Sequence, residues 1–491
     1  MSKERPQAMA GGSTSAISQD RLRVPPFGSR VAAGGALAVS VATLVFLAAF
    51  TAKNLLYVSG SLLAGGLGIS ALWIAATNRR FRYWAAIAAV LLVGGAIAIL
   101  VAAGRGIAAV AIALVGIVAA WALGTVALRW EVRQALAERW HHVPATRRGV
   151  VLMNPRSGGG KVERLNLAEE ARRRGIDAVL LERGDDLRLL AEAAVARGAD
   201  ALGMAGGDGS QAVVASVAAG HRLPFVCVPA GTRNHFALDL GIDRNDVVGA
   251  LDAFGPALET TIDLGEVNGR AFVNNVSLGL YARIVASEEY REAKRRIVAE
   301  MLPDLLGADA APSGLMVRGP DGPIMDAQVI QVSNNPYALS SVSGFGSRPR
   351  LDTGSLGVAT LSISRPIDVS RLVALEAAGH PERFQGWRQW TTSALEVTGP
   401  SPLAVATDGE AHAWAPPLHI AIRPAALRVR IAPGQPGASP ALLWAPVGVS
   451  TLVGLGRILR GRPSGILGRS GGRAQREHPT TRSTGRSTTR S

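Results

Sequence analysis

The sequence predicts a multi-domain protein in which transmembrane α-helices precede a doubly wound α/β domain and a C-terminal β-sandwich domain. Long apolar stretches without charge fill the first third of the chain. From about residue 149 short apolar strands alternate with helices, and from about residue 260 strand-rich segments take over. A chain of 491 residues is long enough for a membrane region and two domains, each with its own core.

Four uncharged stretches each approach the roughly 20 residues that a helix needs to cross a bilayer. They cover residues 31–50, 54–77, about 83–103 and 107–128, so that residues 31–128 form a predicted membrane region. Arginines precede the first stretch, follow the fourth and join the second to the third, which places both ends in the cytoplasm. We therefore expect a multi-pass protein of the cell membrane with its later domains in the cytoplasm. A buried helical bundle of a soluble protein is the alternative.

The segments around these stretches are polar or basic. Residues 1–30 are expected to be a disordered leader, 129–147 a linker, and 433–491 a basic, mostly disordered tail. Residues 457–491 hold nine arginines and one glutamate, a charge that would attract an anionic membrane surface. The apolar and basic part of the tail could instead lie on that surface as a helix. Nucleic acid is not an expected partner, since the tail lacks interleaved aromatic residues.

Residues 148–258 repeat a strand, turn and helix pattern that is typical of a parallel, doubly wound sheet. One helix is expected over 161–174, and a second is expected to be capped by Asp185 and closed by Gly198. The only cysteine, Cys227, lies in an apolar strand and is expected in the core. Its isolation excludes an internal disulfide framework.

Three glycine-rich turns each follow a predicted strand. They read NPRSGGGK (154–161), GGDGS (206–210) and PAGTRN (229–234). Because the carboxyl ends of parallel strands share one edge of a sheet, we expect the turns to meet there. Backbone N–H groups in such turns can approach phosphate oxygens closely, so the sequence predicts a polyphosphate ligand.

Asp208 in the second turn is an unusual neighbour for phosphate groups. A carboxylate there would repel them unless a divalent cation lies between the two, and the turn therefore implies Mg²⁺ together with the nucleotide. An N-cap of the following helix is the alternative role. The chain lacks both the GxxxxGK[ST] pattern and a GxGxxG pattern at the first strand turn, which disfavours a P-loop ATPase and a dinucleotide-binding fold.

The three turns and a later TDGE (407–410) resemble, in order and spacing, the motifs of the diacylglycerol kinase catalytic family, which includes sphingosine and ceramide kinases. The resemblance covers about 148–432. It implies an ATP-binding α/β domain (148–258) of the type shared by NAD kinases and diacylglycerol kinases, followed by a β-sandwich domain (259–432) for the lipid substrate. NAD kinases and phosphofructokinases share the Gly-Gly-Asp-Gly turn, so that turn alone does not select among them.

The resemblance also implies roles for individual residues. Glu410 matches the proposed general base, Asp208 the essential aspartate, and Asp263 an acidic position that helps to hold the metal through water. The implied nucleotide contacts are Asn154, Ser157, Gly158, Gly206, Gly207, Asp208, Gly209, Gly231, Thr232 and Asn234. Three positions depart from the family pattern, namely Ser210, His235 and Thr353, and the last puts a structural Mg²⁺ near Asp352 in doubt.

These patterns together predict a membrane-anchored lipid kinase that uses ATP and Mg²⁺. Diacylglycerol is the first candidate acceptor, and a sphingoid base, ceramide or another lipid is the alternative. A non-catalytic nucleotide-binding sensor or scaffold is the alternative from a different functional class, and the presence of Glu410 favours an enzyme over it. The sequence leaves the oligomeric state open, a homodimer included.

Overall fold

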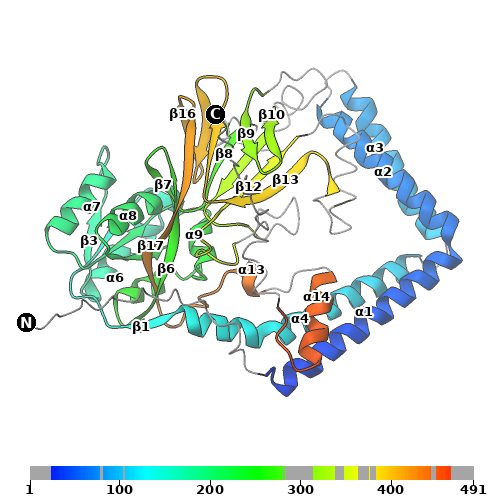
Figure 1. The fold of residues 1–491 in the computed structure, drawn as a ribbon, viewed down its shortest axis with the longest axis horizontal. Helices are drawn as coiled ribbons and strands as arrows, with labels where there is room; N and C mark the ends of the chain where they lie inside the picture. Colours follow the sequence, from blue (N-terminus) through cyan, green and yellow to red (C-terminus); the bar gives the residue numbers. More distant parts are fainter. Residues whose placement is uncertain are drawn as a thin grey trace, which may run out of the picture.

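The computed structural model describes residues 24–77, 81–102, 106–279, 282, 313–337, 348–362, 375, 383–443 and 449–465. Its first elements are the helices α1 (Phe27–Lys53), α2 (Leu55–Thr77), α3 (Arg82–Ala102) and α4 (Gly106–Arg139). Helix α1 packs along α4, and α2 packs along α3. Figure 1 shows the two pairs meeting at an angle beside the strand-rich part of the chain.

The four predicted apolar stretches all form helices, but they differ in length. Three described helices are long and apolar enough to cross a membrane, namely Phe27–Lys53, Leu55–Leu72 and Ala108–Arg139. The described apolar part of α3, Tyr83–Ile99, is shorter. Large apolar side chains on these helices remain exposed, Leu56 by 87% and Val90 by 72%, as suits helices that face lipid.

The α/β part begins with parallel strands β2 (Gly149–Met153), β3 (Asp177–Leu180), β4 (Ala201–Ala205) and β5 (Pro224–Val228). They lie in the order β5-β4-β2-β3. Every residue of β2, β4 and β5 is buried, Cys227 included. Strands buried on both faces are what a doubly wound sheet requires. The connecting helices are η2 (Ser157–Gly159), α5 (Lys161–Arg164), α6 (Leu167–Arg173), α7 (Leu187–Ala196), α8 (Asp208–Gly220), α9 (His235–Asp239) and η3 (Gly249–Phe254).

Two local predictions in this part were wrong. The helix expected over 161–174 is interrupted before Asn166, whose φ of 47° is left-handed, and becomes α5 and α6. The cap of α7 is Asp186, which accepts hydrogen bonds from the N–H groups of Arg188 and Leu189. Asp185 instead accepts from the N–H of Glu182. Gly198 follows α7 with a φ of 90°, as a helix-ending glycine should.

The later part of the chain forms a β-sandwich. One layer has the order β13 (Trp387–Thr392), β12 (Leu356–Leu361), β11 (Val329–Ser333), β8 (Asn275–Gly279), β15 (Leu403–Thr407) and β16 (Glu410–Trp414). The other contains β10 (Gly322–Met325), β9 (Met316–Gly319), β14 (Ala394–Thr398), β17 (Leu418–Ile431), β6 (Ala257–Val267), β7 (Arg270–Phe272) and the short β1 (His141–Val143). Val276 and Ile330 of the first layer share a core with Val397 and Ile420 of the second. The predicted fold class is thus confirmed.

Strand β17 belongs to both parts of the fold. Its first half pairs with β14, and its end pairs in parallel with β5 at Arg428–Arg430. Strand β6 runs antiparallel to it for nearly its whole length, across a bulge between Arg423 and Leu427. One continuous sheet therefore passes from the α/β part into the sandwich. The domain boundaries 148–258 and 259–432 stay a prediction, because any boundary near residue 258 separates strands that are hydrogen-bonded to each other.

The segment after β17 differs from the expected disordered tail. It contains α13 (Pro440–Leu443) and α14 (Val449–Leu459). Leu455 and Ile458 of α14 are buried against Ala33 and Ala36 of α1 and against Leu128 of α4. Small residues on α1 let this helix approach closely. Residues 466–491, which carry most of the tail arginines, lie outside the described residues.

Candidate active site

The three glycine-rich turns lie against one another at the carboxyl ends of β2, β4 and β5. The N–H of Asn154 in the first turn donates to the carbonyl of Ala205, directly before the second turn, at 2.9 Å. The Lys161 ammonium donates to the carbonyl of Gly231 in the third turn at 3.2 Å. The buried amide of Gln211 donates to the last residue of β5, Val228, at 3.0 Å and to Met204 in β4 at 2.8 Å. The structure therefore brings together the turns that the sequence predicts to meet.

The glycines of these turns serve two different purposes. At Gly158, which has a φ of 56°, a Cβ would lie 3.0 Å from the carbonyl oxygen of Gly231, and a Cβ on Gly231 would lie 2.6 Å from the Cα of Gly207. These two glycines allow the turns to touch. Gly207 is extended, with φ −81° and ψ 172°, and a Cβ there would meet nothing within 4 Å. Neither conformation nor the space around its own Cβ position requires a glycine at 207, and the glycine leaves the space before the turn open.

Asp208 is the first residue of α8, but its carboxylate caps the neighbouring helix. It accepts hydrogen bonds from the N–H groups of His235 at 3.1 Å and Phe236 at 3.2 Å, at the start of α9. The alternative role of a cap is thus present, on a different helix from the one expected. A carboxylate has about four lone-pair sites, so these two bonds leave acceptor capacity on both oxygens.

Two of the predicted nucleotide contacts hold the turns themselves. Asn234 is buried and left-handed, with a φ of 51°. Its amide donates to the carbonyls of Pro229 at 3.0 Å and Gly231 at 2.9 Å, which fixes the third turn. The side-chain oxygen of Asn154 accepts from the N–H of Arg156 at 3.1 Å in the first turn.

Glu410 reaches the N-terminus of α8 from β16, in the first layer of the sandwich. It begins β16 after a two-residue turn in which Asp408 (φ 50°) and Gly409 (φ 87°) are both left-handed, as in the tightest β-hairpins. A Cβ on Gly209 would lie 2.6 Å from the carboxyl carbon of Glu410, so the Glu410 carboxylate stands beside the residue that follows Asp208. Its Oε2 is 3.2 Å from a guanidinium nitrogen of Arg270, and half of the side chain remains exposed.

Asp408 is a residue of this site that the sequence reasoning missed. It accepts hydrogen bonds from the N–H groups of Val273 at 2.9 Å, Asn274 at 2.8 Å and Asn275 at 3.2 Å. Burial raises the pKa of Asp408 to about 7, and the charge of Asp208 acts in the same direction, while the three N–H donors oppose the rise. The Asp-Gly pair between two alternating strands was the signal that could have identified it.

The hydrogen-bond donors to the Asp263 carboxylate come from outside the three turns. Its two carboxylate oxygens accept from the N–H groups of Ala425 at 2.8 Å and Gly354 at 2.7 Å. Asp352 is engaged by Arg350 at 2.9 Å. Among the described residues, no group of three or more His, Cys, Asp or Glu side chains is placed to hold a metal ion. Mg²⁺ is commonly held by one or two carboxylates plus substrate phosphates, and Asp208 fits a cation that arrives with a nucleotide.

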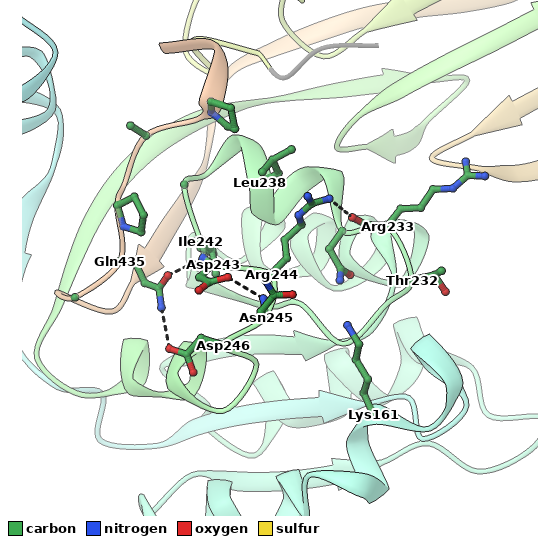
Figure 2. A pocket seen from close by; sticks show the side chains of 16 residues that line it. Lys161, Thr232, Arg233, Leu238, Ile242, Asp243, Arg244, Asn245, Asp246 and Gln435 are labelled. Carbon is green, nitrogen blue, oxygen red and sulfur yellow. Dashed lines mark hydrogen bonds between the residues drawn. The ribbon is translucent and has the colours of Figure 1, made fainter. Parts of the chain in front are cut away.

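A cavity of about 720 Å³ opens beside the third turn. Lys161 and Thr232 lie at one end of it, and Gln435 lies toward the other, near Asp243 and Asp246 (Figure 2). Gln435, from the segment that follows β17, accepts from the N–H of Asp243 at 2.7 Å and donates to Asp246 at 3.4 Å. The volume is typical of small-molecule sites. No sequence motif had indicated the end of the cavity near Gln435, Asp243 and Asp246.

Residues 148–267 match the family model of the diacylglycerol kinase catalytic domain. This region belongs to the diacylglycerol kinase catalytic-domain family. The matched region of the catalytic domain contains all three turns and Asp263, whereas Glu410 lies beyond it.

Three similar proteins are named as diacylglycerol kinases. A diacylglycerol kinase of Mycobacterium tuberculosis (strain ATCC 25618 / H37Rv) is 38% identical over 120 residues, which are 24% of this chain and 39% of that protein. A diacylglycerol kinase of Staphylococcus aureus (strain Newman) is 27% identical over 250 residues, which are 48% of this chain and 75% of that protein. A crystal structure of a diacylglycerol kinase from Bacillus anthracis str. Sterne covers 59% of this chain and 98% of its own, with 16% identity and a TM-score of 0.41.

Proposed function

We propose that this protein is a membrane-anchored lipid kinase that transfers the γ-phosphate of ATP to a lipid hydroxyl, with diacylglycerol as the first candidate acceptor and phosphatidic acid as its product. One observation carries the proposal. A carboxylate from the first layer of the sandwich, Glu410, stands at the N-terminus of α8 beside Gly209 of the second glycine-rich turn, the residue that follows Asp208. A sensor that only bound nucleotide would have no need of that carboxylate.

Each part of the site has a role in this reaction. The backbone N–H groups of the turns, with the N-terminal end of α8, bind phosphate oxygens, and Gly207 leaves the space that they need. The proposed nucleotide contacts are those named from the sequence, from Asn154, Ser157 and Gly158 through Gly206, Gly207, Asp208 and Gly209 to Gly231, Thr232 and Asn234. Magnesium supplies charge neutralisation between the phosphates and Asp208 when it is bound. Water-mediated help from Asp263 stays a sequence-based prediction.

Glu410 is proposed as the general base. It accepts the proton of the lipid hydroxyl while that oxygen forms its bond to the γ-phosphorus and the bond from phosphorus to the departing ADP oxygen breaks. Arg270 contacts Oε2 of Glu410, which leaves Oε1 for the proton. Because little covalent chemistry falls to the protein in such transfers, most of the acceleration is expected from placement of the groups.

The apolar helices explain how a lipid acceptor would be reached. Helix α4 ends at Arg139, directly before Trp140 and the first strand. The Trp140 indole donates to the carbonyl of Gly437 at 2.8 Å, so the chain entering the domain is bonded to the chain leaving it. We propose that the helices anchor the protein in the cell membrane, that the site faces the cytoplasm, and that the basic tail contacts anionic lipid.

The test uses the full-length protein in nanodiscs with labelled ATP and Mg²⁺. Diacylglycerol, ceramide and sphingosine are offered separately, beside the variants Asp208→Asn and Glu410→Gln. We expect label in one lipid class and a loss of at least a hundredfold in both variants, with nucleotide binding retained in Glu410→Gln. Glu396→Gln, an exposed carboxylate of β14 paired with His419, is the matched control. Label in no lipid, or equal label in all three variants, would refute the proposal.

A further inference from the structure

A fully buried arginine lies between the two parts of the proposed active site. The Arg348 side chain has no exposed surface and pairs with Asp239, which is almost as deeply buried, at 2.7 Å. Its Nη1 donates to the carbonyls of Val273 and Asn334, both at 2.6 Å, and its Nη2 donates to the side chain of Asn274 at 2.8 Å. Burying such a pair is costly, and apolar side chains of equal volume often give equal or greater stability. Stability alone therefore does not explain this arginine.

On one side Arg348 connects to Asp208. Asp239 accepts both the Nε–H and the backbone N–H of Arg348, at 2.7 and 2.8 Å. It is the last residue of α9, a helix of five residues. The first N–H groups of the same helix, from His235 and Phe236, hold the Asp208 carboxylate. A single helical turn thus separates the arginine from the groups that orient Asp208.

On the other side Arg348 connects to Glu410. The guanidinium holds the carbonyl of Val273 and the side chain of Asn274. The N–H groups of these two residues hold the carboxylate of Asp408, two residues before Glu410. Fixing the 273–274 backbone therefore fixes the hairpin turn from which Glu410 projects.

We propose that Arg348 is a positioning residue that sets the placement of Glu410 relative to Asp208. The inference rests on the proposed function, because it gives the two carboxylates their roles. A guanidinium suits the task, since its planar fork presents donors in fixed directions to both sides at once. A lysine ammonium carries its three donors on one nitrogen at the end of a flexible stem and cannot hold Asp239, Val273 and Asn274 in the same way.

The experiment compares full-length Arg348→Lys, Asp239→Asn and Asn274→Ala with a control, Arg388→Lys. Arg388 lies in β13 and makes an exposed ion pair with Asp321 at 3.3 Å. Steady-state lipid phosphorylation gives kcat and the KM for ATP, and hydrogen exchange with mass spectrometry reports on peptides covering 234–240, 270–278 and 404–412. A displacement of about 1 Å can lower a rate by about a hundredfold. We expect kcat to fall by roughly ten- to a hundredfold in Arg348→Lys while the KM for ATP changes by less than about threefold.

Hydrogen exchange distinguishes a positioning role of Arg348 from a purely local structural role. We expect faster exchange in all three peptides of Arg348→Lys and unchanged exchange in Arg388→Lys. An unchanged kcat, or faster exchange confined to one peptide, would overturn the inference. If Arg348→Lys does not fold, the same criteria apply to Asp239→Asn and Asn274→Ala, which keep the arginine. If the wild-type protein labels no lipid, the proposed function fails, and the exchange result alone decides whether Arg348 couples the two segments.

Discussion

Substituting Gly209 by alanine should separate the stability of this protein from its proposed activity. Gly209 lies in the first turn of α8 with ordinary helical backbone, so alanine adopts its conformation without strain. The added Cβ would lie 2.6 Å from the carboxyl carbon of Glu410 and 3.2 Å from its Cγ. Both atoms belong to the end of a flexible, half-exposed side chain, which can move away.

The magnitudes follow from these distances. Carbon atoms in contact are about 3.5–4.0 Å apart, so the Glu410 carboxyl group must withdraw by about 1 Å. Misplacing a catalytic group by that distance costs on the order of a hundredfold in rate. Replacing glycine by alanine within a helix favours folding by about 0.5–1 kcal/mol. We therefore expect activity to fall about a hundredfold while the free energy of unfolding stays equal or rises.

The same helix supplies the control. Gly220 ends α8, and a Cβ there would meet nothing within 4 Å. Gly220→Ala should leave lipid phosphorylation unchanged. The assay is labelled phosphate transfer to lipid by both variants in nanodiscs, with urea unfolding followed by circular dichroism. Full activity in Gly209→Ala, or an equal loss in Gly220→Ala, would show that the contact with Glu410 has no part in the reaction.

Three further outcomes are expected. Gly207→Val should abolish nucleotide binding, measured with a fluorescent ATP analogue, at little cost in stability, because its side chain enters open space at the turn; binding at wild-type affinity would contradict the role given to that space. The pKa of Asp408 is about 7 in the folded state, against an ordinary value of 3.8. Between about pH 4 and pH 7 the folded state therefore keeps a proton that the unfolded state releases. The free energy of unfolding should fall on the order of 1 kcal/mol per pH unit as the pH rises through this range. Urea unfolding over that range should show this slope for wild type and not for Asp408→Asn, and equal slopes would refute the protonation of Asp408. Ile458→Ala removes a fully buried side chain from the contact of α14 with α1 and should cost about 2–5 kcal/mol there; limited proteolysis should then cleave 449–465 faster, and an unchanged rate would mean that α14 is held elsewhere.

The meeting of the three turns could be predicted because it depends on local pattern and one rule of sheet geometry. Each glycine-rich run follows a strand whose residues are all buried, and parallel strands put their carboxyl ends at one edge. The contact between Gly209 and Glu410 could not be derived in this way, because about 200 residues separate them. Only the family resemblance indicated Glu410, and its approach to α8 depends on how the sandwich layers pack.

The features that the sequence did not indicate have physical causes of the same kind. Asp185 and Asp186 are neighbouring acids, and the sequence could not show which of them faces the first N–H groups of α7. The metal role of Asp263 stays a prediction, and the backbone N–H groups that bond to both of its carboxylate oxygens are a result of tertiary structure that no motif encodes. Helix α14 is short and surrounded by Gly and Pro, and its stability comes from packing on α1 rather than from its own propensity.

The shared strand β17 determines how the proposed active site can work. Its antiparallel pairing with β14 and its parallel pairing with β5 belong to one sheet, so a hinge motion between the two parts of the fold would have to break bonds in the middle of that sheet. Arg348 adds a second connection between the same parts on the side of the turns. With two such connections, we expect Asp208 and Glu410 to keep their separation whether or not a nucleotide is bound. Stabilisation of the developing charge would then come from groups already in place, which is why small displacements at Gly209 or Arg348 are expected to reduce the rate strongly.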